Sequence, residues 1–254
     1  MSNRFVRKWT RVYYNGYDIS GYTRSWGQAG VTYDLIGESD PMLDEAVKGV
    51  LVGQGNPSIG PISSVMDSTA SGMHATFSSQ PGGVITVAIG FDGVPAPGDP
   101  SYSGYFEQLG YVGDVGEDVP ISLTFNQSVN ATSLLYDNYW GVLIHENAAE
   151  TAANTADASD HDHGAQTALG GYMIYHLLSS DGTCTIKVQD ADTELNASYS
   201  DLLSSGEIDA SVTPASGMVA LARNATVERY TRWQLALNTA TTATFVISFH
   251  RAIR

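Results

Sequence analysis

The densest group of side chains that could bind a metal ion lies in the segment DASDHDHG. It places Asp157, Asp160, His161, Asp162 and His163 within seven residues. Imidazole nitrogens and carboxylate oxygens are ligands that zinc and other divalent ions take. The surrounding sequence is rich in alanine, threonine and aspartate, and it offers no rigid element that would hold such ligands in place. We therefore interpret the segment as a solvated acidic loop, and we predict no metal site and no cofactor.

The side chains that could carry catalysis show no pattern typical of an enzyme. The chain has six histidines and a single cysteine, Cys184. His74, His145, His176 and His250 lie in apolar or strand-like stretches, where a hydrogen-bonded structural histidine is the common case. The sequence contains no GxSxG nucleophile motif, no P-loop and no GxGxxG in a strand-to-helix context. We predict that the protein is not an enzyme and has no catalytic residues.

An aromatic cluster occurs in YDNYW, where Tyr136 and Tyr139 precede Trp140. Such side chains can stack on sugars, as in carbohydrate-binding sandwiches, or anchor a protein interface. The third interpretation, which we favour, is that the cluster packs between two domains.

Charge is distributed unevenly along the chain. Of 254 residues, 27 are acidic and 12 are basic, which gives a net charge of −15 at pH 7. Five bases lie in the first 24 residues and five in the last 32, whereas the stretch between them carries 25 acids and only Lys48 and Lys187. Such an excess favours a surface that repels an anion or faces a basic partner. Near the N-terminus the bases are interleaved with apolar side chains, and we predict an assembly interface there, made of Arg4, Phe5, Arg7, Lys8, Trp9 and Arg11.

The rest of the sequence predicts β-structure. Segments 84–91, 121–125, 184–189 and 244–250 alternate with period two, as half-buried strands do. Turn signals separate them, among them NG at 15–16 and DG at 181–182. One short helix is expected near 41–48, because Asp40 suits its N-cap, Pro41 its first position and Gly49 its end. The fold class that follows is all-β, with two β-sandwich or barrel domains.

Domain limits follow from changes in composition. We place two domains at 1–128 and 129–254, and within the second we predict a mobile loop at 147–168, because its composition cannot bury a core. The first residues lack the apolar core of a signal peptide, and no run approaches 18 apolar residues. We therefore expect a soluble protein that is made in a reducing cytoplasm.

The order of several motifs resembles the major tail proteins of long-tailed bacteriophages. The stretch YYNGYDISGYTRSW, followed by AVKGVLVGQGNPSIGPISSVMDS, is similar to the opening of these proteins. The stretches YMIYHLLSSDGTCTIKVQDADTELNASYSDLL and VERYTRWQLALNTATTATFVISFHR are similar to the β-domain that many of them carry at the C-terminus. The resemblance covers most of the chain and departs from the family pattern in the long 147–168 loop.

The resemblance implies a virion structural protein, assembled in the host cytoplasm and located in the virion tail. Residues 1–128 would be the polymerising tail-tube domain, and 129–254 the appended sandwich. Copies would form stacked rings, hexameric or built as a pseudo-hexamer from trimers, that contact other tail proteins. Genome DNA would pass through an acidic lumen without specific binding. The alternatives are another phage subunit, such as a head decoration or connector protein, and a carbohydrate-binding module with Tyr139 and Trp140 as its stacking platform.

Overall fold

The computed structural model describes residues 9–38, 49–65, 78, 82–114, 122–129 and 140–252. We call the described residues up to 129 the N-terminal half and residues 140–252 the C-terminal half. The N-terminal half contains β1 (Thr10–Tyr14), β2 (Tyr17–Asp18), β3 (Thr23–Glu38), β4 (Gly49–Val65), β5 (Gly82–Ile89), β6 (Pro100–Asp114) and β7 (Ser122–Val129). The C-terminal half contains β8 (Trp140–Glu150), β9 (His161–Asp162), β10 (Gly171–Ser180), β11 (Thr183–Ala191), a 3₁₀ turn (Asn196–Ser198), β12 (Ser200–Asp209), β13 (Ala215–Ala220), β14 (Tyr230–Leu237) and β15 (Ala243–Arg251).

The described strands form two antiparallel sheets. The larger sheet has the order β13-β10-β15-β8-β6-β5-β1-β2, and β7, β4 and β3 branch from the distal end of β6. The smaller sheet has the order β12-β11-β14-β9. The large sheet passes from one half to the other where β6 pairs with β8, through Pro100↔Val142, Ser101↔Gly141 and Tyr102↔Trp140. The two halves therefore share one sheet through a ladder of three residue pairs.

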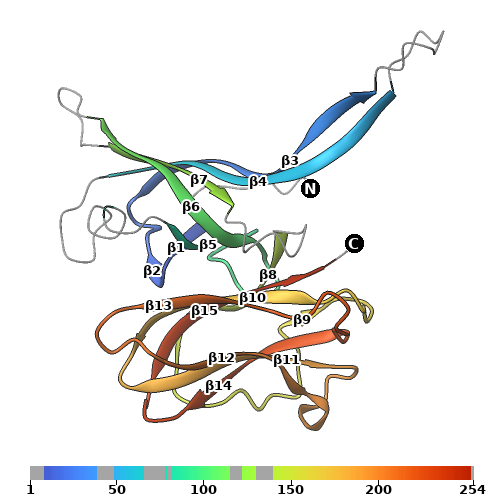
Figure 1. Cartoon of the computed structure of the whole chain (residues 1–254). Coiled ribbons are helices and arrows are strands. Elements are labelled where there is room, and N and C mark those ends of the chain that lie inside the picture. Colours follow the sequence, from blue (N-terminus) through green and yellow to red (C-terminus); the bar gives the residue numbers. More distant parts are fainter. Residues whose placement is uncertain are drawn as a thin grey trace.

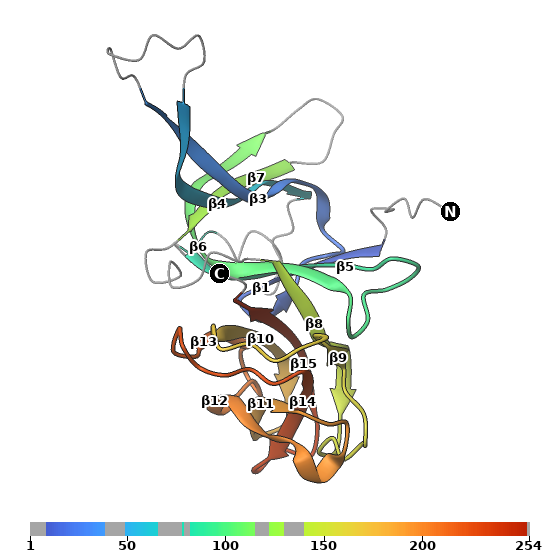
Figure 2. The same cartoon turned by 90° about the vertical axis from the view of Figure 1, so that its right-hand side faces the viewer.

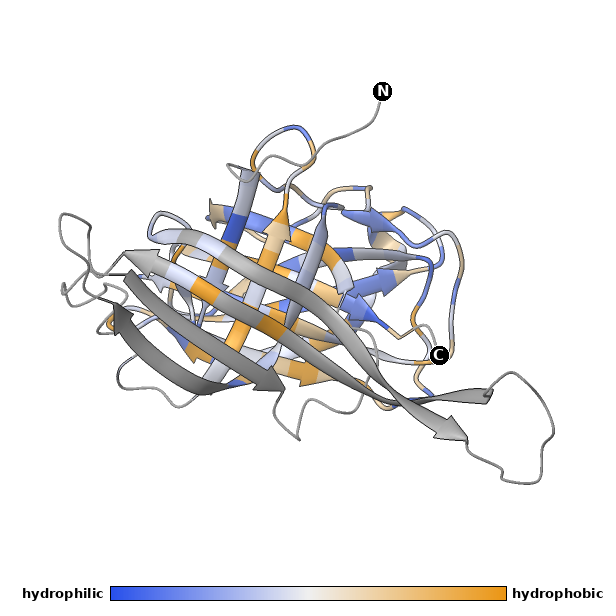
Figure 3. Ribbon diagram, turned by 90° about the horizontal axis from the view of Figure 1, so that it is seen from above, coloured by the Kyte–Doolittle hydropathy of each residue, from blue (hydrophilic) through white to orange (hydrophobic). Residues whose placement is uncertain are grey.

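The layers stack in the order that Figure 1 shows from bottom to top: the small sheet, then β13-β10-β15-β8, then β6-β5-β1-β2, then the β3–β4 ribbon with β7. Seen from above, hydrophobic positions gather on the crossed strands at the centre of the described part (Figure 3). The sheet folds over itself, because β2 and β5 at one end lie near β10 and β13 at the other.

The second layer is covered on both faces. In β15, Phe245, Ile247 and Phe249 pack into the core of the C-terminal sandwich against β11 and β14. The alternate residues Val246, Ser248 and His250 are as deeply buried, but they face the N-terminal half. β10 shows the same division between two buried faces. The sequence predicts this alternation; the second face, expected to be half buried, is covered by β1, β5 and β6.

The N-terminal half has its own core on the far side of β1, β5 and β6. Apolar side chains from these strands pack there against β4, and they include Val12, Tyr14, Ile85, Val87, Tyr102, Phe106, Ile59 and Ile62. This layer therefore also has one face toward each neighbouring layer. On the side of the C-terminal half lie Tyr13 of β1 and Val84 and Ala88 of β5.

The predicted fold class is confirmed: the protein is nearly all β, with two sheets. The helix expected near 41–48 falls outside the described residues. The domain limit at 128/129 stays a prediction, and the halves that it separates share a sheet. No helix in the described ranges is long and apolar enough to cross a membrane.

The predicted loop at 147–168 needs a correction. Its first residues complete β8, which ends at Glu150, and His161–Asp162 forms β9, which pairs with Tyr230 and Thr231 of β14. Thr167 makes an isolated bridge to Val227. The composition correctly indicates a segment without a core of its own. It misses that side chains of β14 provide partners for it. Its mobility in solution stays a prediction.

Candidate functional site

The ribbon of β3 and β4 extends away from the body of the molecule (Figures 1 and 2). The two strands pair from Thr23↔Ser64 to Glu38↔Gly49. β7 covers β4 only from Ser58 to Val65. Among the described strands, residues 49–57 of β4 therefore have β3 as their one neighbour, and β3 has only β4. We call residues 31–38 together with 49–57 the arm; Figures 1 and 2 show it leaving the body of the molecule.

The sequence explains where the arm begins. Pro57 immediately precedes the first β4 residue that pairs with β7, and proline has no N–H to give to a neighbouring strand. Strand edges in natural proteins are commonly protected by charged residues, lysine above all. β4 has no charged residue, and the arm part of β3 has only Asp34 and Glu38. Both outer edges of the arm thus lack the usual protection against pairing.

The register of the arm also shows a pattern of residue types. Near the body, apolar pairs alternate with small polar ones, and beyond the register shift at Asp34 two apolar pairs are adjacent before the described ribbon ends at Glu38↔Gly49. The apolar pairs are Ala29↔Ile59, Val31↔Pro57, Leu35↔Val52 and Ile36↔Leu51, and the polar ones are Gly30↔Ser58 and Thr32↔Asn56. Alternation is typical of a ribbon with one covered face.

Most of the predicted N-terminal interface, Arg4 to Lys8, lies outside the described residues. Trp9 and Arg11 are described and half-buried. The backbone carbonyl of Trp9 accepts the N–H of Gly90 at 3.0 Å, and Arg11 pairs with Ala88 in β5. Trp9 immediately precedes β1, and Arg11 is the second residue of that strand. The role of the predicted interface in assembly stays a prediction.

Of the predicted aromatic cluster, Tyr136 and Tyr139 also lie outside the described residues. Trp140 begins β8 and is 39% exposed. Its ring meets the ring of Tyr102 edge-on, with 5.2 Å between the centroids. Tyr102 belongs to the core of the N-terminal half, so Trp140 packs where the two halves meet. The interdomain interpretation of the cluster stays a prediction.

The DHDHG segment holds its side chains in contacts with β14 and with Arg229, the residue just before that strand. Asp162 accepts two hydrogen bonds from the guanidinium of Arg229, at 2.8 and 2.7 Å. Asp160 accepts the backbone N–H of Trp233 at 2.8 Å, and burial raises the pKa of this carboxyl to about 6. His163 bonds to Thr231, and burial, with the nearby His161 and Arg251, lowers its pKa to about 3. Within the described residues, no three His, Cys, Asp or Glu side chains are arranged to hold a metal ion.

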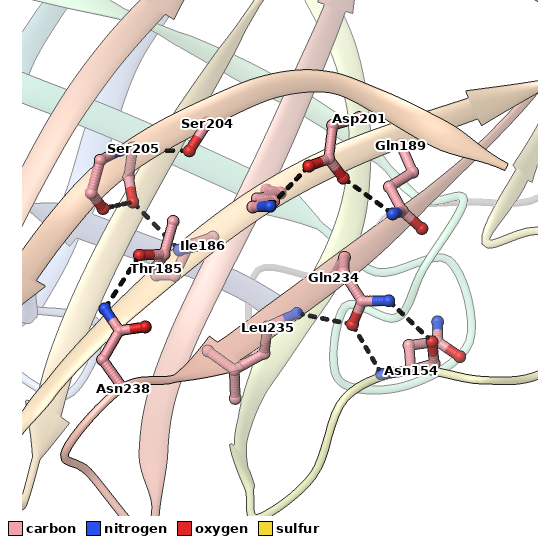
Figure 4. A network of polar contacts seen from close by, with 12 residues as sticks. Asn154, Thr185, Ile186, Gln189, Asp201, Ser204, Ser205, Gln234, Leu235 and Asn238 are labelled. Carbon is pink, nitrogen blue, oxygen red and sulfur yellow. Dashed lines mark hydrogen bonds and ion pairs between the residues drawn. The ribbon is translucent and has the colours of Figure 1, made fainter.

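Residues 151–160, which we call the strap, run along the small sheet. Gln234 and Asn154 bond to each other twice, because the Gln234 carbonyl accepts the Asn154 N–H and the Gln234 amide donates to the Asn154 carbonyl (Figure 4). Arg232, only 2% exposed, donates to the carbonyl of Ala156 at 2.7 Å and to Gln189 and Asn196. These side chains of β14 bind a segment for which the sequence predicts a mobile loop.

A second group of polar side chains lies between the two halves, and we call this interface the joint. His176 of β10 is fully buried there. Its Nδ1 accepts the backbone N–H of Gly16 at 3.2 Å, and its Nε2 lies 2.9 Å from the hydroxyl of Thr86. Burial lowers the pKa of His176 to about 3, so the ring is neutral near pH 7. Because Nδ1 accepts the N–H of Gly16, the proton of the neutral ring lies on Nε2. The histidine therefore connects β10 with the β1–β2 turn and β5.

The joint also contains a serine–histidine group near the β6–β8 ladder. Ser248 bonds to Ser101 and Ser103 of β6 and to Nε2 of His250, the last at 2.7 Å. The ring of His250 stacks on Tyr172 with 4.5 Å between the centroids. A hydroxyl beside an imidazole is the pair used in nucleophilic catalysis. Here all these residues are at most 2% exposed, so a substrate has no access and the group serves packing between the halves.

Comparison with known proteins adds little to these observations. No known family model matches the sequence, and no curated protein matches it. Among solved structures, the chain is similar to the SPP1 Dit protein, described as a paradigm of the hub adsorption apparatus in phages that infect Gram-positive bacteria. The TM-score is 0.32 and the identity 10%, over 94% of this chain and 98% of that one. For the phage p2 baseplate in its activated conformation with Sr, the values are 0.35 and 8%, over 96% and 98%. Likeness at this level assigns no function.

Proposed function

We propose that the chain is a bacteriophage virion structural protein that assembles with itself into stacked rings of a tail tube and has no catalytic role. The observation that carries the proposal is the arm. A two-stranded ribbon on its own is at best marginally stable in water. This one presents two strand edges with little charge. Its marginal stability and its open edges call for a partner that covers the arm.

A second copy of the chain is the partner that the arm fits best. Strand edges pair through backbone groups, and they therefore accept another strand without a matching side-chain sequence. An arm of nine residues reaches about 30 Å from the body, at about 3.3 Å per residue. A contact between an arm and a different surface of the next copy is head-to-tail, and such contacts close into rings when the rotation permits. The sequence resemblance to major tail proteins supports the same assembly.

The acidic character of the chain suits a conduit for DNA. The net charge of −15 disfavours binding to phosphates, so a lumen lined by this protein would let DNA slide. The arm contributes little to that charge, because Asp34 and Glu38 are its only charged residues in the described ranges. The lumen's acidity would thus come from the body. A hexameric ring and a pseudo-hexamer of trimers both satisfy this arrangement.

The test removes the arm without opening the body. Gly30 and Ser58 are register partners, so replacing residues 31–57 with an Asn-Gly turn closes a shorter hairpin at that pair. We expect a folded chain, with an unchanged circular dichroism spectrum, that sediments as a monomer and shows no rings or tubes by electron microscopy. The parent at the same micromolar concentration should form them. Val212→Ser, at a position 93% exposed and remote from the arm, is the matched control and should assemble normally.

Two results would contradict the proposal. One is an arm-deleted chain that still forms rings, and the other is a parent that stays monomeric at every concentration and salt level. Single rings without tubes would favour the connector or decoration alternative, which would use the same arm. The carbohydrate-binding alternative gains no support, since Trp140, its described aromatic residue, packs against Tyr102 between the halves.

A further inference from the structure

The joint between the halves is built around a turn that the sequence singles out. Asn15 and Gly16 both have positive φ, 47° and 87°, as the two central residues of a type I′ hairpin turn do. The side chain of Asn15 accepts the N–H of Val84, which fixes the turn on β5. A Cβ on Gly16 would lie 2.7 Å from Cβ of Pro214 and 2.9 Å from the backbone of Ala215. The turn is thus wedged against the start of β13 with no room for a side chain.

His176 is the polar contact between this turn and β10. Its two ring nitrogens meet the N–H of Gly16 and the hydroxyl of Thr86, and the ring is fully buried. Among the residues packed on it, Tyr13 of β1 is the titratable one, with 5.8 Å between ring centroids. The neighbouring strands place Ser216 of β13 and Val246 of β15 beside it. Burial is the cause of its lowered pKa, and no charged side chain contributes.

Tyr13 itself faces charged groups at the rim of the joint. Burial raises its pKa above the usual range, and Asp18 and Glu146 act in the same direction while Arg11 opposes them. At the same rim, Asn147 of β8 donates to Asp18 at 3.1 Å. None of these groups neutralises a charge on His176, so a proton on the ring would be buried without a counter-ion.

We propose that His176 is an acid-operated latch between the two halves. When its ring takes up a proton, both nitrogens become donors, and Nδ1 can no longer accept the N–H of Gly16. The Asn15–Gly16 turn then separates from β10, while the three β6–β8 pairs keep the halves connected as a hinge. The latch is independent of the arm and of ring assembly. In it, the Asn15–Gly16 turn has the role of a releasable contact between the two halves.

Thiol labelling can report the opening of the latch against an internal control. Ala88 is fully buried in the joint, and Ala88→Cys adds a single small group there. The native Cys184 is fully buried in the sandwich core, where burial raises its pKa to about 11, so it reports unfolding of the C-terminal half. A pyridyl disulfide that reacts in acid labels both thiols. Rates are normalised to those of the unfolded chain at each pH.

The expected signal follows from the two protonation states. The pKa of His176 is about 3 with the joint closed, and about 6.5 is the value for a solvated histidine, so the open fraction should rise about 30-fold between pH 8 and pH 5. Labelling of Ala88→Cys should rise by that factor while Cys184 stays protected. In the background His176→Gln, which cannot take up a proton, the rise should disappear. The latch would be overturned by a labelling rate of Ala88→Cys that does not change with pH, or by a parallel rise in the labelling rate of Cys184. An unchanged rise for Ala88→Cys in the His176→Gln background would overturn it as well.

A second variant decides the case if His176→Gln opens the joint at every pH. Thr86→Val keeps the histidine and its contact with Gly16 but removes the hydroxyl partner. Its labelling profile must still rise in acid if the proton acts at Nδ1, and loss of the rise would refute the proposal.

Discussion

Replacing Arg232 with alanine should detach the strap from the small sheet. The guanidinium is 2% exposed and donates four hydrogen bonds, two to Gln189 and one each to Ala156 and Asn196. It also lies 3.9 Å above the ring of Tyr199, a cation–π contact. Alanine provides none of these donors. The carbonyl of Ala156 would then have to turn toward water, which lifts the strap from β14.

The size of the effect can be worked from these contacts. A hydrogen bond from a charged donor stabilises a protein by about 1.5–3 kcal/mol net, and the cation–π contact adds about 1 kcal/mol. The Gln189 and Asn196 side chains regain water once the strap moves, so we expect a net loss of about 3–5 kcal/mol. For a chain of this size that corresponds to a fall in the melting midpoint of about 6–20 °C.

Two measurements check this prediction. Urea unfolding at pH 7 gives the change in the free energy of unfolding, and brief proteinase K digestion with mass spectrometry shows whether cleavage within 151–160 increases. Arg232→Lys keeps the charge without the planar fork of donors, and it should lose most of the same stability. Arg229→Ala breaks an exposed ion pair beside the strap and should change the midpoint much less. A midpoint for Arg232→Ala within about 2 °C of the parent, with unchanged cleavage, would refute the reasoning.

Three further predictions concern charge. Asp160→Asn should raise the free energy of unfolding at pH 7 by up to about 3 kcal/mol, because burial raises the pKa of the Asp160 carboxyl from its ordinary value of 3.8 to about 6 in the folded chain. The stability that the protonated carboxyl provides is lost as pH rises between these two values, whereas the amide stays neutral and can still accept the N–H of Trp233. Denaturant titrations should show the gain vanish near pH 4; an equal gain there would contradict the sign. Replacing Arg4, Arg7 and Lys8 with serine should leave a folded subunit that polymerises poorly at low salt and partly recovers polymerisation at moderate salt. Sedimentation measures this, and normal assembly of the variant at low salt would show that these bases are not part of an assembly interface. Elemental analysis of protein without a histidine tag should find no stoichiometric metal; one metal per chain, lost when both DHDHG histidines become alanine, would oppose this.

Strand positions and the division of their faces follow from the sequence, because alternation with period two directly reflects which side chains are buried together. Residues 244–250 illustrate both the strength and the limit of this reasoning. Phe245, Ile247 and Phe249 share the sandwich core as the pattern predicts. The pattern does not reveal that Ser248 and His250 on the other face are buried, since polar residues that satisfy one another across a joint look like residues that face water.

The strap shows a different limit. Its composition predicts a mobile loop, and a segment poor in apolar residues indeed contributes no core. What holds it are Arg232 and Gln234, more than 70 residues later in the chain, which bond largely to its backbone. Backbone carbonyls and amides are present in every sequence, so such contacts leave no compositional signal. The Asn15–Gly16 pair predicts a turn, but the contact of this turn with His176 spans 160 residues of sequence and leaves no local pattern.

The two-sided burial of β10 and β15 has a consequence for how this chain can change over evolutionary time. A domain that is merely tethered can be exchanged for another as a cassette, because its surface owes nothing to its neighbour. Here alternate positions of the same two strands serve the sandwich core and the joint. A foreign C-terminal half joined to this N-terminal half would bring an outer face suited to water, and it would leave Tyr13, Val84 and Ala88 without the side chains that cover them. Recombination at this boundary should therefore succeed only when β1, β5 and β6 are inherited together with the strands that cover them.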